Sequence, residues 1–267
     1  AVAQTIARTM SVQTQIMPQI NGLAEEAGAR RELAACYRLF DFLGWTETIF
    51  NHITLRVPGE DSGRPLYLIN PFGLHYGEVT PGNLVKIDFA GNDVEGSGRL
   101  VNKAGFIIHG AIHAAREDAH CIIHVHTTAG CAVACKQSGL RHDNFYSAML
   151  YDEVAYHDYE GVTTGLDEQP RLVASLGDKN YLILRNHGLL VTGATLGEAF
   201  QRLWTLQRAC EIQLASDAGQ GPNHPIALEV LKQVPATRLG KQAGNEGHAQ
   251  RIFDAMLRKA GIDTQRL

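Results

Sequence analysis

The hydrophobic positions along the chain follow a helical period in some segments and form short apolar runs in others. Apolar residues recur every three or four positions in segments 25–44, 101–118 and 195–216, which predicts three amphipathic helices. Shorter apolar runs bounded by Gly, Pro or Asn predict strands at residues 51–57, 65–70 and 121–127. Residues 83–96 are predicted to form a strand followed by a turn, and residues 180–193 two short strands around a tight turn. Since these elements interleave without the regular spacing of βαβ units, we expect a mixed or antiparallel sheet with helices on its faces.

The chain shows no internal repeat and no low-complexity tract, and no Pro/Gly/Ser-rich linker precedes about residue 217. A length of 267 residues is sufficient for one large hydrophobic core. We therefore predict one domain over residues 25–216, preceded by an N-terminal extension (1–24). The segment 217–267 is expected to be a C-terminal helical extension of the same domain.

The composition of the chain indicates which kinds of binding partner and which cellular compartment to expect. Residues Lys and Arg number 24 against 28 Asp and Glu, so the slightly acidic chain gives no reason to expect nucleic acid or an anionic membrane as a partner. No apolar stretch approaches the roughly 18–20 residues that a membrane span needs, and the first residues lack the pattern of a secretory signal. The five cysteines form no CxxC pair, which is typical of buried thiols in a reducing compartment. We expect a cytoplasmic protein.

Candidate chemistry begins at CIIHVH, residues 121–126. Because a strand alternates its faces, His124 and His126 point to one side and Val125 to the other. The two imidazoles can chelate one metal ion, or they can be polar residues at a strand end. A third histidine, His187, lies in a predicted tight turn between two apolar strand segments and could complete a three-ligand site with an open coordination position.

Six motifs occur in an order that resembles the class II aldolase/adducin family, over roughly residues 30–215. They are NHITLR, LINPFG, AGFIIHGAIHAA, IIHVHTTAG, LRNHGLLVTG and LGEAFQRLWTLQRACEIQL. The resemblance implies a three-layer α/β/α fold with a mixed, mostly antiparallel central sheet, and a homotetramer with sites between subunits. It also implies that His124, His126 and His187 bind a divalent metal ion, with zinc as the expected ion.

The chain departs from the aldolases of that family at their acid/base. In the aldolases a carboxylate lies four residues before a histidine of the helix that precedes H-x-H. Counting back from His109, that position holds Gly105, which cannot transfer a proton.

The residues that hold the substrate phosphate in the aldolases are also largely replaced. The matching pairs here are Asn51-His52, Phe72-Gly73 and Lys103-Ala104, of which Gly73 alone agrees with the aldolase pattern. Phe72 offers no hydrogen bond to a phosphate oxygen, although Lys103 could meet an anion as a point charge. The sequence therefore predicts a metal site without the sugar-phosphate apparatus.

Two residues are candidates to replace the missing carboxylate. His52 could act as a substitute acid/base or contact an anion, and a structural role for it is equally open. Tyr159 lies in a region where the aldolases use a tyrosine of a neighbouring subunit as proton donor, although core or interface tyrosines are common there. His109 and His113, four residues apart, are expected to pack or to orient a ligand imidazole rather than bind metal directly.

Two functions from different classes follow. The first is a metal-dependent lyase, a carbon–carbon lyase of the aldehyde-lyase type, acting on a small hydroxy-carbonyl or hydroxy-acid substrate other than a standard sugar phosphate. His52 and Tyr159 would be catalytic, and Asn51, Gly73 and Lys103 would bind the substrate. The second is a non-catalytic, adducin-like metal-binding or oligomeric interaction module. The intact histidine triad favours the enzyme, and Gly105 favours the alternative.

Overall fold

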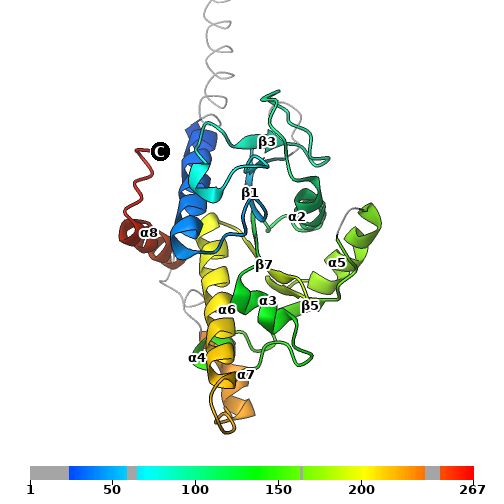
Figure 1. Cartoon of the computed structure of the whole chain (residues 1–267), viewed down its shortest axis with the longest axis vertical. Coiled ribbons are helices and arrows are strands. Elements are labelled where there is room, and N and C mark those ends of the chain that lie inside the picture. Colours follow the sequence, from blue (N-terminus) through cyan, green and yellow to red (C-terminus); the bar gives the residue numbers. More distant parts are fainter. Residues whose placement is uncertain (1–23, 59–64, 163–164, 238–246) are drawn as a thin grey trace, which may run out of the picture.

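A computed structural model describes residues 24–58, 65–162, 165–237 and 247–267 of the protein. Its centre is a seven-stranded sheet with the strand order β3-β2-β1-β4-β7-β6-β5 (Figure 1). The strands are β1 (His52–Val57), β2 (Leu66–Ile69), β3 (Val85–Ile87), β4 (Cys121–Val125), β5 (Val154–His157), β6 (Tyr181–Leu184) and β7 (Gly188–Gly193). All neighbouring strands are antiparallel except β5 and β6, which are parallel. The predicted mixed, mostly antiparallel sheet is confirmed.

Helices cover both faces of the sheet (Figure 1). An N-terminal helix is described over residues 24–43. The other α-helices are α2 (Lys103–Ala115), α3 (Thr128–Ala134), α4 (Phe145–Ala148), α5 (Gln169–Leu176), α6 (Leu196–Asp217), α7 (Leu228–Thr237) and α8 (His248–Ala260). Two short 3₁₀ helices are η1 (Tyr76–Glu78) and η2 (Leu166–Glu168). None of the helices described is long and apolar enough to cross a bilayer.

The alternation of side chains along β4 shows how the three layers form. Cys121, Ile123 and Val125 pack into the core that the sheet shares with the N-terminal helix, α6 and α8. Ile122 points the other way, into a second core with α2 and α5. Because successive strand residues face opposite sides, His124 lies on the α2 side of the sheet. The same alternation in β1 places His52 and Thr54 on that side.

The C-terminal segment contributes to the main core. Phe253 of α8 is fully buried and its ring centroid lies 5.4 Å from that of Phe200 in α6. Helix α8 therefore packs on α6 beside the N-terminal helix (Figure 1). Nearly all of the predicted N-terminal extension (1–24) lies outside the described residues.

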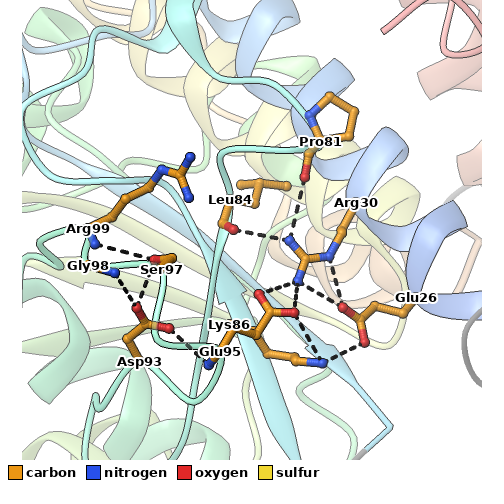
Figure 2. Close-up of polar contacts among 10 residues, drawn as sticks. All are labelled: Glu26, Arg30, Pro81, Leu84, Lys86, Asp93, Glu95, Ser97, Gly98 and Arg99. Atoms are coloured by element: carbon orange, nitrogen blue, oxygen red, sulfur yellow. Dashed lines mark hydrogen bonds and ion pairs between the residues drawn. The ribbon is translucent and has the colours of Figure 1, made fainter.

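A network of ion pairs attaches the N-terminal helix to the edge strand β3 (Figure 2). Lys86 of β3 is only 5% exposed, and its ammonium lies 2.9 Å from Glu26 and 3.4 Å from Glu95. Arg30 contacts the same two carboxylates, at 2.8 Å and 2.7 Å. Burial alone would raise the pKa of Glu26, but hydrogen bonds from Lys86 and Arg30 outweigh it and lower that pKa.

Candidate metal centre

Three imidazoles converge where β4 ends beside the turn between β6 and β7. His124 lies in β4, His126 follows its last residue, and His187 lies in the turn. The Nε2 atoms of His124 and His126 are 2.8 Å apart, and one ring nitrogen from each of the three lies within 4.8 Å of the others. Within the described ranges, no other group of three His, Cys, Asp or Glu side chains comes together in a way that could hold a metal ion.

The backbone determines which nitrogen of His124 faces the cluster. The carbonyl of Leu189 can only accept, so the Nδ1–H of His124 donates to it, at 2.9 Å. Burial lowers the pKa of His124 well below its usual value, which leaves Nε2 unprotonated, with its lone pair available to the cluster. Burial also lowers the pKa of His126, and that of His187 to about 4. Three neutral imidazoles, one of them oriented by a backbone carbonyl, form a donor set that fits a divalent cation.

The turn that carries His187 depends on two unusual positions. Asn186 adopts the left-handed conformation, with φ of 57°. Gly188 has an ordinary φ, but a Cβ there would lie 2.5 Å from the carbonyl oxygen of Val125 and 3.1 Å from the ring of His126. Glycine at 188 is therefore required because the turn passes close to the triad. The left-handed backbone conformation of the turn is adopted by Asn186, not by Gly188.

His52 occupies the space that a side chain at position 105 would need. A Cβ on Gly105 would lie 2.3 Å from Cε1 and 2.5 Å from Nδ1 of the His52 ring. His52 pairs with His124 across β1 and β4, and the two ring centroids are 5.7 Å apart. Burial lowers the pKa of His52 to about 3, so the ring is neutral near pH 7. An imidazole from β1 thus fills the position from which a side chain of α2 would otherwise reach toward the triad.

A chain of hydrogen bonds orients His109 behind His52. The carbonyl of Ala119 accepts from Nδ1–H of His113 at 2.7 Å, so Nε2 of the neutral His113 accepts from the hydroxyl of Thr54, also at 2.7 Å. The oxygen of Thr54 then accepts from Nδ1–H of His109 at 2.8 Å, which leaves His109 Nε2 as an acceptor. That atom is buried and has no hydrogen-bond partner among the described residues. His109 and His113 therefore bond to Thr54 and not to a triad imidazole, which agrees with the expected packing role and not with an orienting role.

Asn51 is a second buried polar group beside His52. Its side chain is 4% exposed, and neither its amide nitrogen nor its amide oxygen has a hydrogen-bond partner in the described part of the chain. Its φ of 67° lies in the left-handed region that favours glycine and, among other residues, asparagine. Asparagine tolerates this conformation better than most residues that carry a Cβ, so the backbone at position 51 is compatible with the residue found there.

Tyr159 lies near the triad of its own chain. Its ring centroid is 6.5 Å from that of His187, and the side chain is 54% exposed. A pocket lies between the end of β5 and the β6–β7 turn, and its lining includes His157, Tyr159, Glu168 and His187. His187 is thus the member of the triad that borders this pocket.

The structure does not test the predicted roles of two substrate-binding residues, Gly73 and Lys103. Gly73 lies in the loop between β2 and η1, has a φ of 99° and leaves open space around the position of a Cβ. The backbone of Lys103 begins α2, and its side chain lies outside the described part of the structure. Their predicted roles stay predictions.

Comparison with known proteins identifies the family. The sequence matches the Class II Aldolase and Adducin N-terminal domain over residues 31–214, which is most of the chain. The chain belongs to this family. A solved aldolase II superfamily protein from Pseudomonas syringae shares 42% identity, with a TM-score of 0.81 over 88% of this chain and 92% of that one.

Relatives within the class II aldolase and adducin family carry two kinds of name. An L-fuculose 1-phosphate aldolase from Glaciozyma antarctica is 31% identical, with a TM-score of 0.77 over 90% of this chain and 92% of that chain. Alpha-adducin of Rattus norvegicus is 43% identical over 86% of this chain, which corresponds to only 32% of the adducin. The family is thus shown, whereas the names of these relatives do not settle an activity for this chain.

Several residues at this family site carried no clear signal in the sequence. His157 and Glu168 are joined at 3.3 Å beside His187, but they lie eleven positions apart and on different elements. Thr54 was part of a motif, yet only the position of α2 over β1 shows that it links two histidines. A polar residue at the end of an apolar strand, as at His157, is the one pattern that could have indicated a site.

Proposed function

We propose that the protein is a metal-dependent lyase of the class II aldolase type that acts on a small hydroxy-carbonyl or hydroxy-acid substrate other than a standard sugar phosphate. The observation that carries this proposal is the convergence of His124, His126 and His187, with Nε2 of His124 left unprotonated, and so able to bind a metal ion, by the bond from Nδ1–H to Leu189. A scaffold that only assembles has no evident need for three such imidazoles.

The three histidines would hold a divalent cation, with zinc as the expected ion. Such an ion would supply Lewis-acid polarisation of a carbonyl or hydroxyl oxygen of the substrate. Neutral imidazoles suit this role because each offers a lone pair without first losing a proton. Burial, which lowers the pKa of each of the three, supports this state.

The remaining groups would bind substrate and carry protons. His52 stands where the aldolases place a carboxylate, and its neutral ring can donate from one nitrogen and accept at the other. Tyr159, whose ring lies near His187, would provide a proton. Asn51 would hydrogen-bond a substrate oxygen with its unpartnered amide, while Gly73 and Lys103 would complete the substrate contacts.

A second candidate is a non-catalytic, adducin-like module that keeps the fold for self-assembly. Gly105, together with the 43% identity to alpha-adducin, favours it. Both candidates include a homo-oligomer, for which a tetramer is proposed from the family resemblance.

The deciding experiment measures metal per chain in the purified protein, in His126→Ala and in a matched control, His120→Ala. His120 directly precedes β4 but is exposed, so its removal leaves the triad intact. We expect about one divalent ion per chain in the parent and the control, and at least a tenfold weaker zinc affinity in His126→Ala. A parent that takes up no metal even after reloading with zinc would leave the non-catalytic candidate in its place.

The substrate class is tested next with the metal-loaded parent. Unphosphorylated hydroxy-ketones and hydroxy-acids are incubated with it, beside the corresponding phosphate esters, and aldehyde or ketone products are measured. Metal-dependent cleavage of an unphosphorylated compound supports the lyase. Faster cleavage of the phosphate ester would contradict the proposed substrate class.

A further inference from the structure

Three carboxylates line the pocket beside His187, although the aldolase carboxylate position in α2 holds glycine. They belong to Asp158, Glu160 and Glu168. The pocket also includes Tyr159 and the ring of His187, so a ligand held by the triad on its exposed side would meet these acidic groups.

Two of the three carboxylates are neutralised by arginines and face solvent. The Asp158 side chain is 92% exposed and lies 3.7 Å from the guanidinium of Arg185. Glu160 forms a close ion pair with Arg171, whose side chain is half exposed. Neither carboxylate is both shielded from solvent and free of a cationic partner.

Glu168 differs from both. Its side chain is 14% exposed, and among the described residues it bonds only to the ring of His157, whose Nε2 lies 3.3 Å from Oε1. The other carboxylate oxygen has no hydrogen-bond partner among the residues that the structure describes. No lysine or arginine contacts Glu168 within these residues, so its negative charge is only partly compensated.

His157 holds this carboxylate in place. The ring is 5% exposed at the end of β5, and its Nδ1 lies 3.0 Å from the hydroxyl of Ser175 in α5. Since one ring nitrogen contacts α5 and the other contacts η2, the orientation of Glu168 is set by two elements of the fold. A carboxylate held in this way loses little freedom when a ligand binds.

Arg185, the one arginine that lines the pocket, already interacts with other groups. Arg185 donates from Nη1 to the carbonyl of Lys136 at 3.2 Å and stacks on the ring of Tyr156, with Cζ 4.5 Å from its centroid. A phosphate in this pocket would therefore meet Glu168 without a free guanidinium to offset the repulsion. A hydroxyl group would instead donate a hydrogen bond to the carboxylate, which is a charge-assisted and hence strong interaction.

We propose that Glu168, positioned by His157, is a specificity-determining residue that accepts a hydrogen bond from a hydroxyl group of the substrate and disfavours a phosphate at that place. This inference rests on the proposed metal site. It narrows the substrate class to unphosphorylated compounds that carry a hydroxyl group close to the oxygen bound at the triad.

Three hydroxamates of increasing polarity test the inference without knowledge of the substrate. Acetohydroxamate binds a metal ion through its two oxygens, glycolohydroxamate adds a hydroxyl group, and phosphoglycolohydroxamate replaces that hydroxyl with a phosphate. Their dissociation constants are measured calorimetrically on the zinc-loaded protein. We expect glycolohydroxamate to bind about tenfold more tightly than acetohydroxamate, and the phosphate probe to bind no more tightly than acetohydroxamate.

Glu168→Gln should reduce the preference for the hydroxyl probe and raise affinity for the phosphate probe at least fivefold, with zinc content unchanged. Glu160→Gln is the matched control, because it removes a carboxylate from the same pocket that Arg171 already neutralises. Glu168→Asp, which keeps the charge, should retain the discrimination against phosphate. This second variant keeps the test valid should Glu168→Gln fold poorly.

The possible results separate this inference from the proposed function. If zinc binds but the parent shows no preference for the hydroxyl probe, or prefers the phosphate probe, the role of Glu168 is overturned and the metal site stands. If zinc binds and none of the hydroxamates does, the triad has no open position and both proposals fall. An equal effect of Glu160→Gln would also overturn the specific role of Glu168.

Discussion

The ring of His52 lies where a side chain at position 105 would have to be, with Cε1 of His52 only 2.3 Å from the place of a Cβ on Gly105. The two departures from the aldolase pattern, His52 and Gly105, are therefore coupled: each is accommodated by the other. The ring of His52 from β1 fills the space of a side chain from α2, so only glycine fits at position 105.

Gly105→Ala is expected to destabilise the protein by about 1–3 kcal/mol, because the added methyl group overlaps the buried ring of His52. Urea unfolding measures the change. Gly28→Ala is the control: Gly28 lies in the N-terminal helix with nothing within 4 Å of a Cβ, so that variant should be stabilised by about 0.5–1 kcal/mol. In a His52→Ala background Gly105→Ala should cost little, and an equal cost in both backgrounds would contradict this coupling.

Gly188→Ala should weaken zinc binding by about tenfold or more, since a Cβ at 188 would displace the turn from the carbonyl of Val125 and from His126. Competition with a chromogenic chelator measures the affinity. Gly28→Ala again serves as control. Unchanged zinc affinity in Gly188→Ala would show that the close approach of the turn does not position His187.

The buried ring of His113 should make stability fall in mild acid. Burial lowers the pKa of His113 to about 3, although its hydrogen bond to Ala119 opposes that shift. The unfolded chain therefore binds this proton below about pH 6.5 while the folded protein does not, and the free energy of unfolding decreases as the pH falls from there toward 3. Between pH 7 and pH 5 this group alone should remove about 2 kcal/mol.

Urea unfolding of the parent and His113→Gln at both pH values measures this contribution. The variant should lose about 2 kcal/mol less than the parent between pH 7 and pH 5. His120→Gln, which changes an exposed histidine, should behave as the parent does. The same pH dependence in His113→Gln and in the parent would refute the assignment.

Glu26→Gln should destabilise the protein by about 1–3 kcal/mol, because it leaves the 5% exposed ammonium of Lys86 with a weaker set of anionic partners. Chemical denaturation at pH 7 tests this. Glu25→Gln provides a matched control, since Glu25 is the exposed neighbour on the same helix. Equal effects of the two substitutions would show that the network of Figure 2 contributes no specific stability.

The sequence by itself determined several of the elements and the family. Strands at residues 51–57 and 65–70 and the helix at 195–216 were predicted within a residue or two of β1, β2 and α6, because local periodicity reports which face of each element is buried. Motif order indicated the family, and the convergence of His124, His126 and His187 was expected from it.

The tertiary structure alone decided which distant side chains share the site. That His52 fills the place of residue 105 depends on the pairing of β1 with β4 and on how α2 lies across them. That Glu168 lies beside His187 depends on η2 returning to the end of β5 through His157. Neither follows from periodicity, because a repeating pattern reports burial of one element against the core and not the identity of its neighbours.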